Sequence, residues 1–487
     1  MFESALLDRR VSKEEYSAEV PRLREALLEA QSRFADAGAS IALVIAGAEG
    51  AGKGETVNTL LEWLDARGIE AHGIGPPTSE EAGRPPLYRF WRRLPPYGSI
   101  GVFFGSWYTN PIVDHIFGRT DDAGLDRELD RIEAYERMLA DENVIVLKLW
   151  LHVSKKRQRK VFEKLAANPD TAWRVTPRDW EYHETYDEFV ATSARALRRT
   201  DSAHAPWHVI AARDRRHRQL KAGRLLLQAI EKRLDAPPGP IAEPVPVLPP
   251  PEVNLIRSID LTARLDRETY EQCLAREQGR LGRLARRLTE SDRAAVLVFE
   301  GPDAAGKGGC IRRVVQALDA RFYRVVPIAA PTEEERLRPY LWRFWRRLPG
   351  QGQFALYDRS WYGRVLVERI EGFCPPEAWK RAYSEINAFR FEQRKHIGYK
   401  RYKLTEEDWR NREKWLAYES AACDMLERTS TEIARWTPVA AEDKLNARIR
   451  VLESLCEGLE AVLGPDERPT SSGKRKKSKK GGKRKGR

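Results

Sequence analysis

The sequence has little cysteine and no long apolar run, and both absences exclude classes of protein. Its 487 residues include five cysteines, an odd number without the spacing of a metal site. We therefore expect reduced, mostly buried thiols rather than a disulfide framework. No apolar run reaches the length of a membrane span, and the first twenty residues contain no signal-peptide core. The sequence predicts a soluble, cytoplasmic protein without a membrane partner.

The net charge of +13 is concentrated at one end of the chain. Residues 471–487 contain ten Lys or Arg and no acidic residue, which leaves +3 for everything before them. We predict a disordered Lys/Arg-rich tail at 466–487, because like charges repel and the segment has no apolar residues to bury. Such a tail either only solubilises the chain or binds polyanions loosely, nucleic acid included, with a strong salt dependence.

A proline-rich stretch divides the chain into two similar halves. Eight of the fifteen residues 237–251 are proline, which excludes regular helix or sheet. Both halves contain an apolar strand with a glycine-rich loop, then LDAR, RFWRRLP and SWY, with counterparts separated by 254 positions throughout. This internal duplication predicts a first domain at 1–235, a linker at 236–251 and a second domain at 252–465.

Within each half, short apolar segments alternate with longer amphipathic ones. The strand candidates of the first half are IALVIAG, IEAHGIG, SIGVFFG, NVIVLKLWLH and WHVIAA. Strands with few polar interior positions, separated by helices, indicate a parallel sheet that is covered on both faces. The predicted fold is therefore two tandem three-layer α/β/α domains.

The second half lacks one block of the first. After residue 389 the separation of counterparts changes from 254 to 229, so residues 136–160 have no equivalent. This 25-residue block contains the NVIVLKLWLH strand, and we expect the second copy to lack about one strand. The lost apolar burial is on the order of 10 kcal/mol, at roughly 1.5–3 kcal/mol for each side chain. Such a loss requires the second half to repack its sheet or to be stabilised by contacts with the first half; otherwise the second half folds poorly.

The second half contains a glycine-rich loop in the setting of a phosphate-binding site. The loop GPDAAGKG, residues 301–308, follows the apolar strand AVLVFE and precedes a predicted helix. Glycines allow backbone N–H groups to surround phosphate oxygens, and Lys307 adds a positive charge. Gly308 replaces the Ser or Thr that usually binds Mg²⁺, so oxygen ligands must come from elsewhere. Asp303 in the loop and Asp358 at the end of the apolar run FALY are the candidates.

Several cations accompany these acids, and the first half has lost many of them. Arg359 and Arg364 flank SWY, LWRFWRRLP supplies further arginines, and Lys400, Arg401 and Lys403 precede a predicted helix. Guanidinium groups suit phosphate recognition and the stabilisation of a transferring phosphoryl group. In the first half, Glu49, Phe104, Gly105 and Asn110 stand in the places of Asp303, Asp358, Arg359 and Arg364. Chemistry is therefore expected in the second half, with a scaffolding or weak-binding role for the first.

The motifs GPDAAGKGG, RFWRRLP, DRSWYGRVLVERIEGF, KLTEEDWRNREKW and MLERTST resemble those of the polyphosphate kinase type 2 family. The two-domain arrangement is similar to the branch that phosphorylates AMP. The resemblance implies a P-loop kinase fold with a mobile lid, and Mg²⁺-dependent transfer from inorganic polyphosphate to AMP, giving ADP. It also implies that catalysis occurs in the second domain.

Carried over by motif, the resemblance implies roles for individual residues. The catalytic residues would be Asp303, Lys307, Asp358 and Arg359. Asp303 and Asp358 would organise Mg²⁺ and the acceptor phosphate, Lys307 would hold phosphates, and Arg359 would stabilise the transferring group. The substrate-binding residues would be Gly306, Gly308, Arg343, Arg347, Arg364, Lys400, Arg401 and Lys403, of which the last three form the lid stretch that closes over the donor.

Three alternatives remain open at this stage. The acceptor could be ADP or GDP, or the donor could be ATP. The chain could also bind polyphosphate or nucleotide without turnover, because the missing block separates the lid motif from the phosphate loop. The sequence is compatible with a monomer or a homo-oligomer.

Overall fold

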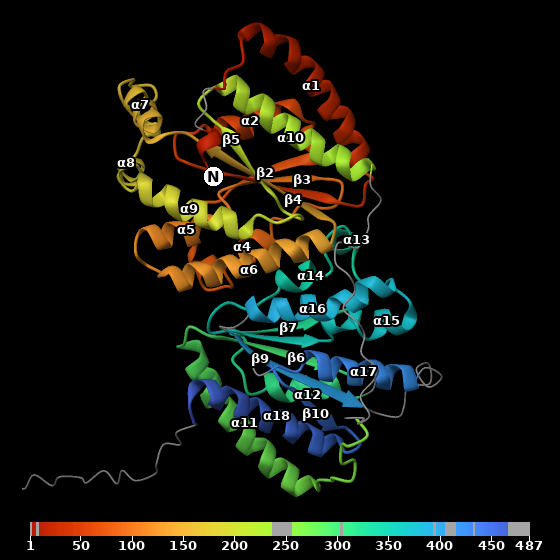
Figure 1. Cartoon of the computed structure of the whole chain (residues 1–487). Helices are drawn as coiled ribbons and strands as arrows, with labels where there is room; N and C mark the ends of the chain where they lie inside the picture. The colour runs from red at the N-terminus through yellow and green to blue at the C-terminus, as the bar shows by residue number, and fades with distance from the viewer. Residues whose placement is uncertain are drawn as a thin grey trace, which may run out of the picture.

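The computed structural model describes residues 2–5, 9–235, 256–301, 305–392, 396–404, 415–431 and 434–465. The linker predicted at 236–251 and the basic tail predicted at 466–487 lie outside these residues. The described chain forms two α/β units, one above the other in Figure 1, as the internal duplication predicts. All five cysteines are free thiols, and no described helix is long and apolar enough to span a membrane.

The first unit is built on a parallel sheet whose described strands are ordered β2-β3-β1-β4-β5. These strands are β1 (Ser40–Gly47), β2 (Ile69–Gly73), β3 (Ile100–Phe104), β4 (Val144–His152) and β5 (Trp207–Ala211). All five segments predicted as strands are confirmed. Strands β1 and β4 are apolar and buried along most of their length, because helices cover both faces of the sheet.

The helices of the first unit form the two outer layers (Figure 1). One layer consists of α1 (Lys13–Phe34), α2 (Lys53–Trp63) and α10 (Arg215–Asp235), and the other of α5 (Thr109–Ile116), α6 (Asp122–Asp141) and α9 (Tyr186–Thr200). The shorter helices are α3 (Ser79–Ala82), α4 (Tyr88–Trp91), α7 (Lys155–Ala166) and α8 (Pro177–Glu184). Local sequence explains several ends; for example, α1 starts after Ser12, whose Oγ accepts a hydrogen bond from Glu15 N at 3.0 Å.

The second unit repeats this plan, with a parallel sheet whose described strands are ordered β10-β9-β6-β8-β7. Its strands are β6 (Ala294–Glu300), β7 (Tyr323–Pro327), β8 (Phe354–Asp358), β9 (His396–Leu404) and β10 (Trp436–Ala440). Its helices are α11 (Arg267–Thr289), α12 (Lys307–Val315), α13 (Glu333–Arg336), α14 (Trp342–Trp345), α15 (Val367–Glu371), α16 (Pro376–Glu392), α17 (Trp415–Thr429) and α18 (Lys444–Leu463). Predicted fold class and tandem arrangement are both confirmed.

The strand count of the second unit corrects one prediction. We expected this copy to lack about one strand, yet the described residues form five strands in each sheet. The segment that was assigned to the lid, with Lys400, Arg401 and Lys403, lies in the sheet as β9. Strand β9 pairs with β6 and β10, which is the place that β4 occupies between β1 and β5.

The register of β9 gives a physical reason for this substitution. Lys400 pairs with Val298 and Trp436, just as Lys148 pairs with Val44 and Trp207 in the first unit. Without a strand at this position, the backbone groups of β6 and β10 would be left unpaired inside the sheet, which is costly. The segment HIGYKRYKL, which has a lysine at the matching place, therefore completes the sheet although it is much less apolar than β4.

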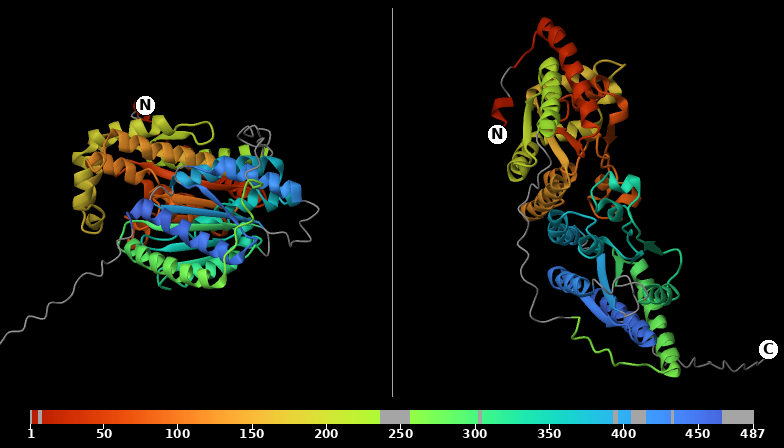
Figure 2. Two further views of the ribbon diagram at one scale, coloured as in Figure 1. Left: turned by 90° about the horizontal axis from the view of Figure 1, so that it is seen from below. Right: turned by 90° about the vertical axis from the view of Figure 1, so that its right-hand side faces the viewer.

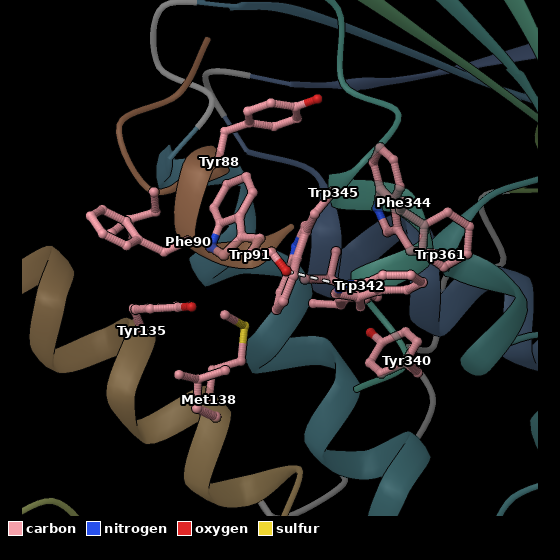
Figure 3. Close-up of a cluster of buried hydrophobic side chains, with 14 of the residues drawn as sticks. Tyr88, Phe90, Trp91, Tyr135, Met138, Tyr340, Trp342, Phe344, Trp345 and Trp361 are labelled. Atoms are coloured by element: carbon pink, nitrogen blue, oxygen red, sulfur yellow. Dashed lines mark hydrogen bonds between the residues drawn. The ribbon is translucent and has the colours of Figure 1, made fainter. Parts of the chain in front are cut away.

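The two units pack end to end through an apolar interface (Figure 2, right-hand view). One continuous cluster of buried side chains includes residues of both units, and Figure 3 shows its centre. Trp91 of α4 stacks on Trp345 of α14, with ring centroids 5.1 Å apart. Trp345 is the counterpart of Trp91 in the duplication, so the two copies meet through the same surface. Trp342 Nε1 donates to Trp91 O at 2.9 Å across this interface.

Backbone hydrogen bonds repeat this pseudo-two-fold relation. Tyr97 N donates to Leu337 O at 2.7 Å, and Gln351 N donates to Gly83 O at 2.9 Å. Tyr97 corresponds to Gln351, and Gly83 corresponds to Leu337, so the two bonds are equivalent. The halves are therefore arranged like the subunits of a symmetric dimer that share one isologous contact.

A buried ionic group at this interface leads to a prediction of pH-dependent stability. Arg381 pairs with Glu142 of the first half at 2.9 Å and with Glu385 at 2.7 Å. Burial, and next the charge of Glu142, raise the pKa of Glu385 from 4.5 to about 8. Below pH 4.5 both the folded and the unfolded chain hold this proton, and the contribution of Glu385 to stability is fully present; above pH 4.5 the unfolded chain releases the proton first. The contribution of Glu385 then falls as the pH rises to about 8.

We expect the conservative variant Glu385→Gln to lose much of that dependence. Chemical unfolding at several pH values between 5 and 8.5 should give a free energy of unfolding with a shallower decline than in the parent chain. An identical decline in both proteins would contradict the assignment to Glu385. The exposed Glu377→Gln, on the same helix, serves as the control.

Candidate active site

The glycine-rich segment of the second unit lies between strand β6 and helix α12, the setting that the sequence predicted. Gly306 ends the loop with a left-handed φ of 74°, a conformation that glycine adopts without strain. Lys307 is only 8% exposed and donates from Nζ to Gly301 O at 2.8 Å. Asp303 lies outside the described residues, so its predicted roles in catalysis and metal binding remain predictions.

The end of β8 brings an acid and a cation to the same place. Asp358 and Arg359 line a cavity of about 370 Å³ together with Gly306, Lys307, Gly308, Pro327 and Ile328. Five of the predicted site residues therefore surround one cavity, at the carboxyl edge of the parallel sheet. This edge is where open α/β sheets bind their ligands.

The backbone at Arg359 is unusual and connects β8 to the loop strand. Arg359 has a left-handed φ of 64°, and its N–H donates to Phe299 O at 3.0 Å. Such a conformation costs a side-chain-bearing residue about 1–2 kcal/mol. The first half places Gly105 here, with φ 84° and with Ile74 O only 2.4 Å from where a Cβ atom would lie. In the first half, glycine adopts this backbone conformation without strain, and Ile74 O occupies the space that an arginine side chain would need.

This comparison predicts that stability and activity respond to Arg359 in opposite directions. Arg359→Gly should raise the free energy of unfolding by about 1 kcal/mol and lower phosphoryl transfer by about 10²-fold. Arg359→Ala should lower transfer equally without the gain in stability, since alanine keeps the strained backbone. Denaturant unfolding and an assay of product formation measure the two effects. Unchanged transfer in Arg359→Ala would remove Arg359 from the reaction.

Sequence reasoning missed one buried acid of this site. Glu300, at the end of β6, is 4% exposed and accepts a hydrogen bond from Ser360 Oγ at 2.6 Å. Burial raises its pKa to about 7, against the opposing effect of the Ser360 hydrogen bond and the charges of Lys307 and Arg359. Glu300 fixes the turn after Asp358 to the loop strand. Its counterpart in the first half is Ala46, so a comparison of the two halves could have marked Glu300 as specific to the second half.

Two predicted substrate-binding arginines, Arg343 and Arg347, form ion pairs with a buried glutamate and are not among the residues that line the cavity. Arg343 and Arg347 pair with the buried Glu335 of α13 at 3.4 and 3.1 Å, and Arg343 also donates to Ala329 O at 3.0 Å. The first half keeps the same set, because Arg89 and Arg93 pair with Glu81 at 3.4 and 3.1 Å. An arrangement that is present in both halves indicates a structural role for these arginines.

The structure describes the side chain of Arg364, but only the backbone of the three predicted lid cations. Arg364 pairs with Glu368 at 2.6 Å and lies over the Tyr340 ring at 4.1 Å, beside the interface between the halves. The backbone of Lys400, Arg401 and Lys403 is held in β9. The lid arrangement predicted for these three residues is therefore not the one that the structure adopts.

The described residues supply only some of the ligands that a divalent metal ion needs. No group of three acidic, histidine or cysteine side chains that could hold an ion occurs among the described residues. Asp358 offers one carboxylate at the cavity wall. Mg²⁺ is commonly bound by one or two carboxylates, substrate phosphates and water, so this sparse ligand set fits the ion.

Fold and cavity together define a class: a parallel α/β phosphotransferase with a glycine-rich phosphate loop. The family model described as Polyphosphate kinase 2 (PPK2) matches residues 10–237, 264–390 and 387–465. The chain belongs to this family. The match to the second half is divided at 387–390, which is where the sequence loses its 25-residue block.

Individual relatives extend over nearly the whole chain. A polyphosphate:AMP phosphotransferase of Pseudomonas aeruginosa is 47% identical over 497 residues, covering 96% of this chain and 100% of the relative. One of Acinetobacter johnsonii is 34% identical and covers 88% of this chain and 92% of the relative. A crystal structure from Pseudomonas aeruginosa, assigned as a polyphosphate kinase 2, has a TM-score of 0.84, 45% identity, and coverage of 96% and 100%.

Proposed function

We propose that the chain transfers phosphoryl groups from inorganic polyphosphate to AMP, giving ADP, and that its second half carries the reaction. The supporting observation is the cavity at Lys307, where a phosphate loop, an acid and an arginine converge. The equivalent positions of the first half hold Phe104 and Gly105. Relatives named polyphosphate:AMP phosphotransferase, similar over almost the full length, favour AMP as acceptor.

The residues at the cavity would have different roles in phosphoryl transfer. Backbone N–H groups around Gly306 and Gly308 and the Lys307 ammonium would hold the phosphates of the donor chain. Arg359 would stabilise the charge on the group in transit, and Asp358 would orient the acceptor and hold Mg²⁺ together with Asp303. Mg²⁺, when bound, supplies positive charge to the phosphate oxygens. Since loose transition states need mainly positioning and charge, no nucleophilic side chain is required.

The test is product formation by the purified full chain with polyphosphate, AMP and MgCl₂. ADP should accumulate with polyphosphate as donor and should be far slower with ATP, and AMP should be preferred over ADP and GDP. Polyphosphate binding without ADP formation would favour the alternative of an impaired binding protein. A preference for another nucleotide would keep the reaction class and change the acceptor.

A further inference from the structure

The first half contains a cavity that the reaction in the second half does not use. It has a volume of about 380 Å³ and lies at the carboxyl edge of the first sheet. Its lining residues Gly73, Ile74, Phe104 and Gly105 are the counterparts of Pro327, Ile328, Asp358 and Arg359 at the catalytic cavity. Both copies therefore have a cavity at this position, but the side chains that line it differ.

The walls of this cavity are apolar and largely aromatic. The larger side chains that line it are Ile74, Phe104, Tyr108, Ile112, Val113, Trp150, Tyr182 and Phe189. Phe104, at the end of β3, is 37% exposed, although solvent exposure of a phenylalanine ring is unfavourable. Trp150 and Phe189 stack with ring centroids 5.6 Å apart; since Trp150 is only 2% exposed, the half-buried Phe189 is the ring through which this Trp150–Phe189 surface meets a ligand. Cavities of this size and composition are typical of small-molecule sites.

The cations nearest to the loop are already neutralised by carboxylates. Lys53 Nζ lies 2.8 Å from Glu49 Oε1 and donates to Gly47 O at 2.9 Å. Arg218, buried beside Gly52, pairs with Glu55 at 2.6 Å. A phosphate entering this loop would have to displace Glu49 and then lie beside its negative charge. The cavity therefore disfavours phosphorylated ligands.

Glu49 nevertheless gives the cavity a hydrogen-bond acceptor. Its side chain lines the cavity and is 43% exposed, and one of its oxygens holds Lys53. A carboxylate beside a glycine-rich loop is well suited to accept hydrogen bonds from sugar hydroxyls, as in other nucleotide-binding folds. An aromatic wall, a carboxylate acceptor, and a lining whose lysine is already paired with that carboxylate together favour a planar ring that carries hydroxyl groups and no phosphate.

We propose that this cavity of the first half binds an unphosphorylated nucleoside. The base lies against Phe104 and the Trp150–Phe189 surface, and Glu49 accepts hydrogen bonds from the ribose hydroxyls. The site is distinct from the catalytic cavity, so the nucleoside and polyphosphate bind without competing.

Calorimetric titration of the full chain with adenosine tests the proposal, with AMP as competitor. Adenosine should bind saturably to the parent chain and equally to Asp358→Ala, which alters only the catalytic cavity. Phe104→Asp, which restores the acid of the other half, should weaken adenosine binding at least about tenfold by removing the aromatic wall. AMP should displace adenosine only at concentrations at least about tenfold higher, because Glu49 repels its phosphate.

A second variant separates the proposal from a folding defect. Val113→Trp adds bulk to a half-buried position of the lining and should block adenosine without removing a buried contact. Both variants should keep the melting temperature and the ADP-forming activity of the parent chain. Loss of adenosine binding in Asp358→Ala with retention in Phe104→Asp would assign the ligand to the catalytic cavity and overturn the proposal. Absence of binding at millimolar adenosine would also overturn it.

Discussion

Lys307→Ala is expected to lower ADP formation by about 10²–10³-fold, whereas Lys53→Ala leaves turnover nearly unchanged. The two lysines occupy equivalent places, but only Lys307 lies in a cavity with an acid and an arginine. Lys53 is neutralised by Glu49 at 2.8 Å, so its charge is not available to a phosphate. Initial rates with saturating polyphosphate and AMP measure the difference.

The two lysine variants also control for each other. Each removes one Nζ that donates to a loop carbonyl, at 2.8 Å in Lys307 and 2.9 Å in Lys53, so their effects on stability should be similar. Equal melting temperatures with unequal turnover would isolate the catalytic contribution. Comparable losses of turnover at both positions would instead overturn the assignment of chemistry to the second half.

Restoring the missing block should raise the rate of ADP formation by about 10²-fold. A displacement of about one ångström of the lid cations Lys400, Arg401 and Lys403 from their catalytic positions is enough to cause a loss of that size. The change is an insertion of residues 136–160 after Phe389, at the place where the two halves lose their correspondence. The inserted strand would pair with β6 and β10, and Lys400, Arg401 and Lys403 would be released from the sheet. The assay is ADP formation beside the parent chain.

The block is suited to transplantation because it includes both partners of its buried ion pair. Lys148 and Glu136 lie 2.7 Å apart with almost no exposure, and both come from residues 136–160. In the first half Lys148 also donates to Tyr108 and to Thr200 O. The second half has kept identical residues, Tyr362 and Thr429, at the matching positions. The same insertion with Lys307→Ala should be inactive, and an active parent with no gain on insertion would show that β9 is the working arrangement.

Much of the architecture and of the cavity was predictable from the sequence, for identifiable physical reasons. Apolar runs flanked by helices specify a covered parallel sheet, and Asp358 could be placed because it ends such a run. The duplication then served as an internal comparison that marked Arg359 and Asp358 as specific to one half. The same comparison contained Glu300 opposite Ala46, but a carboxylate inside a strand gives no local motif.

Other features could not be predicted because they depend on competition between segments. The position of β9 follows from the backbone pairing that the sheet requires, which overrode the likeness of that segment to a lid. Arg343 and Arg347 looked like phosphate ligands, yet they bind Glu335, a partner eight to twelve positions away whose orientation only the fold determines. Asp303 lies outside the described residues and stays a prediction.

The stacked Trp91 and Trp345 make each half of the chain depend on the other for burial of its apolar surface. Both tryptophans are buried in a cluster that includes residues of both halves, so removal of either half would expose a large apolar surface to water. Deletion of the first half should therefore destabilise the second, and we expect the two halves to unfold in a single cooperative transition. The first half is therefore expected to be retained as a structural support of the second, whatever its own chemistry.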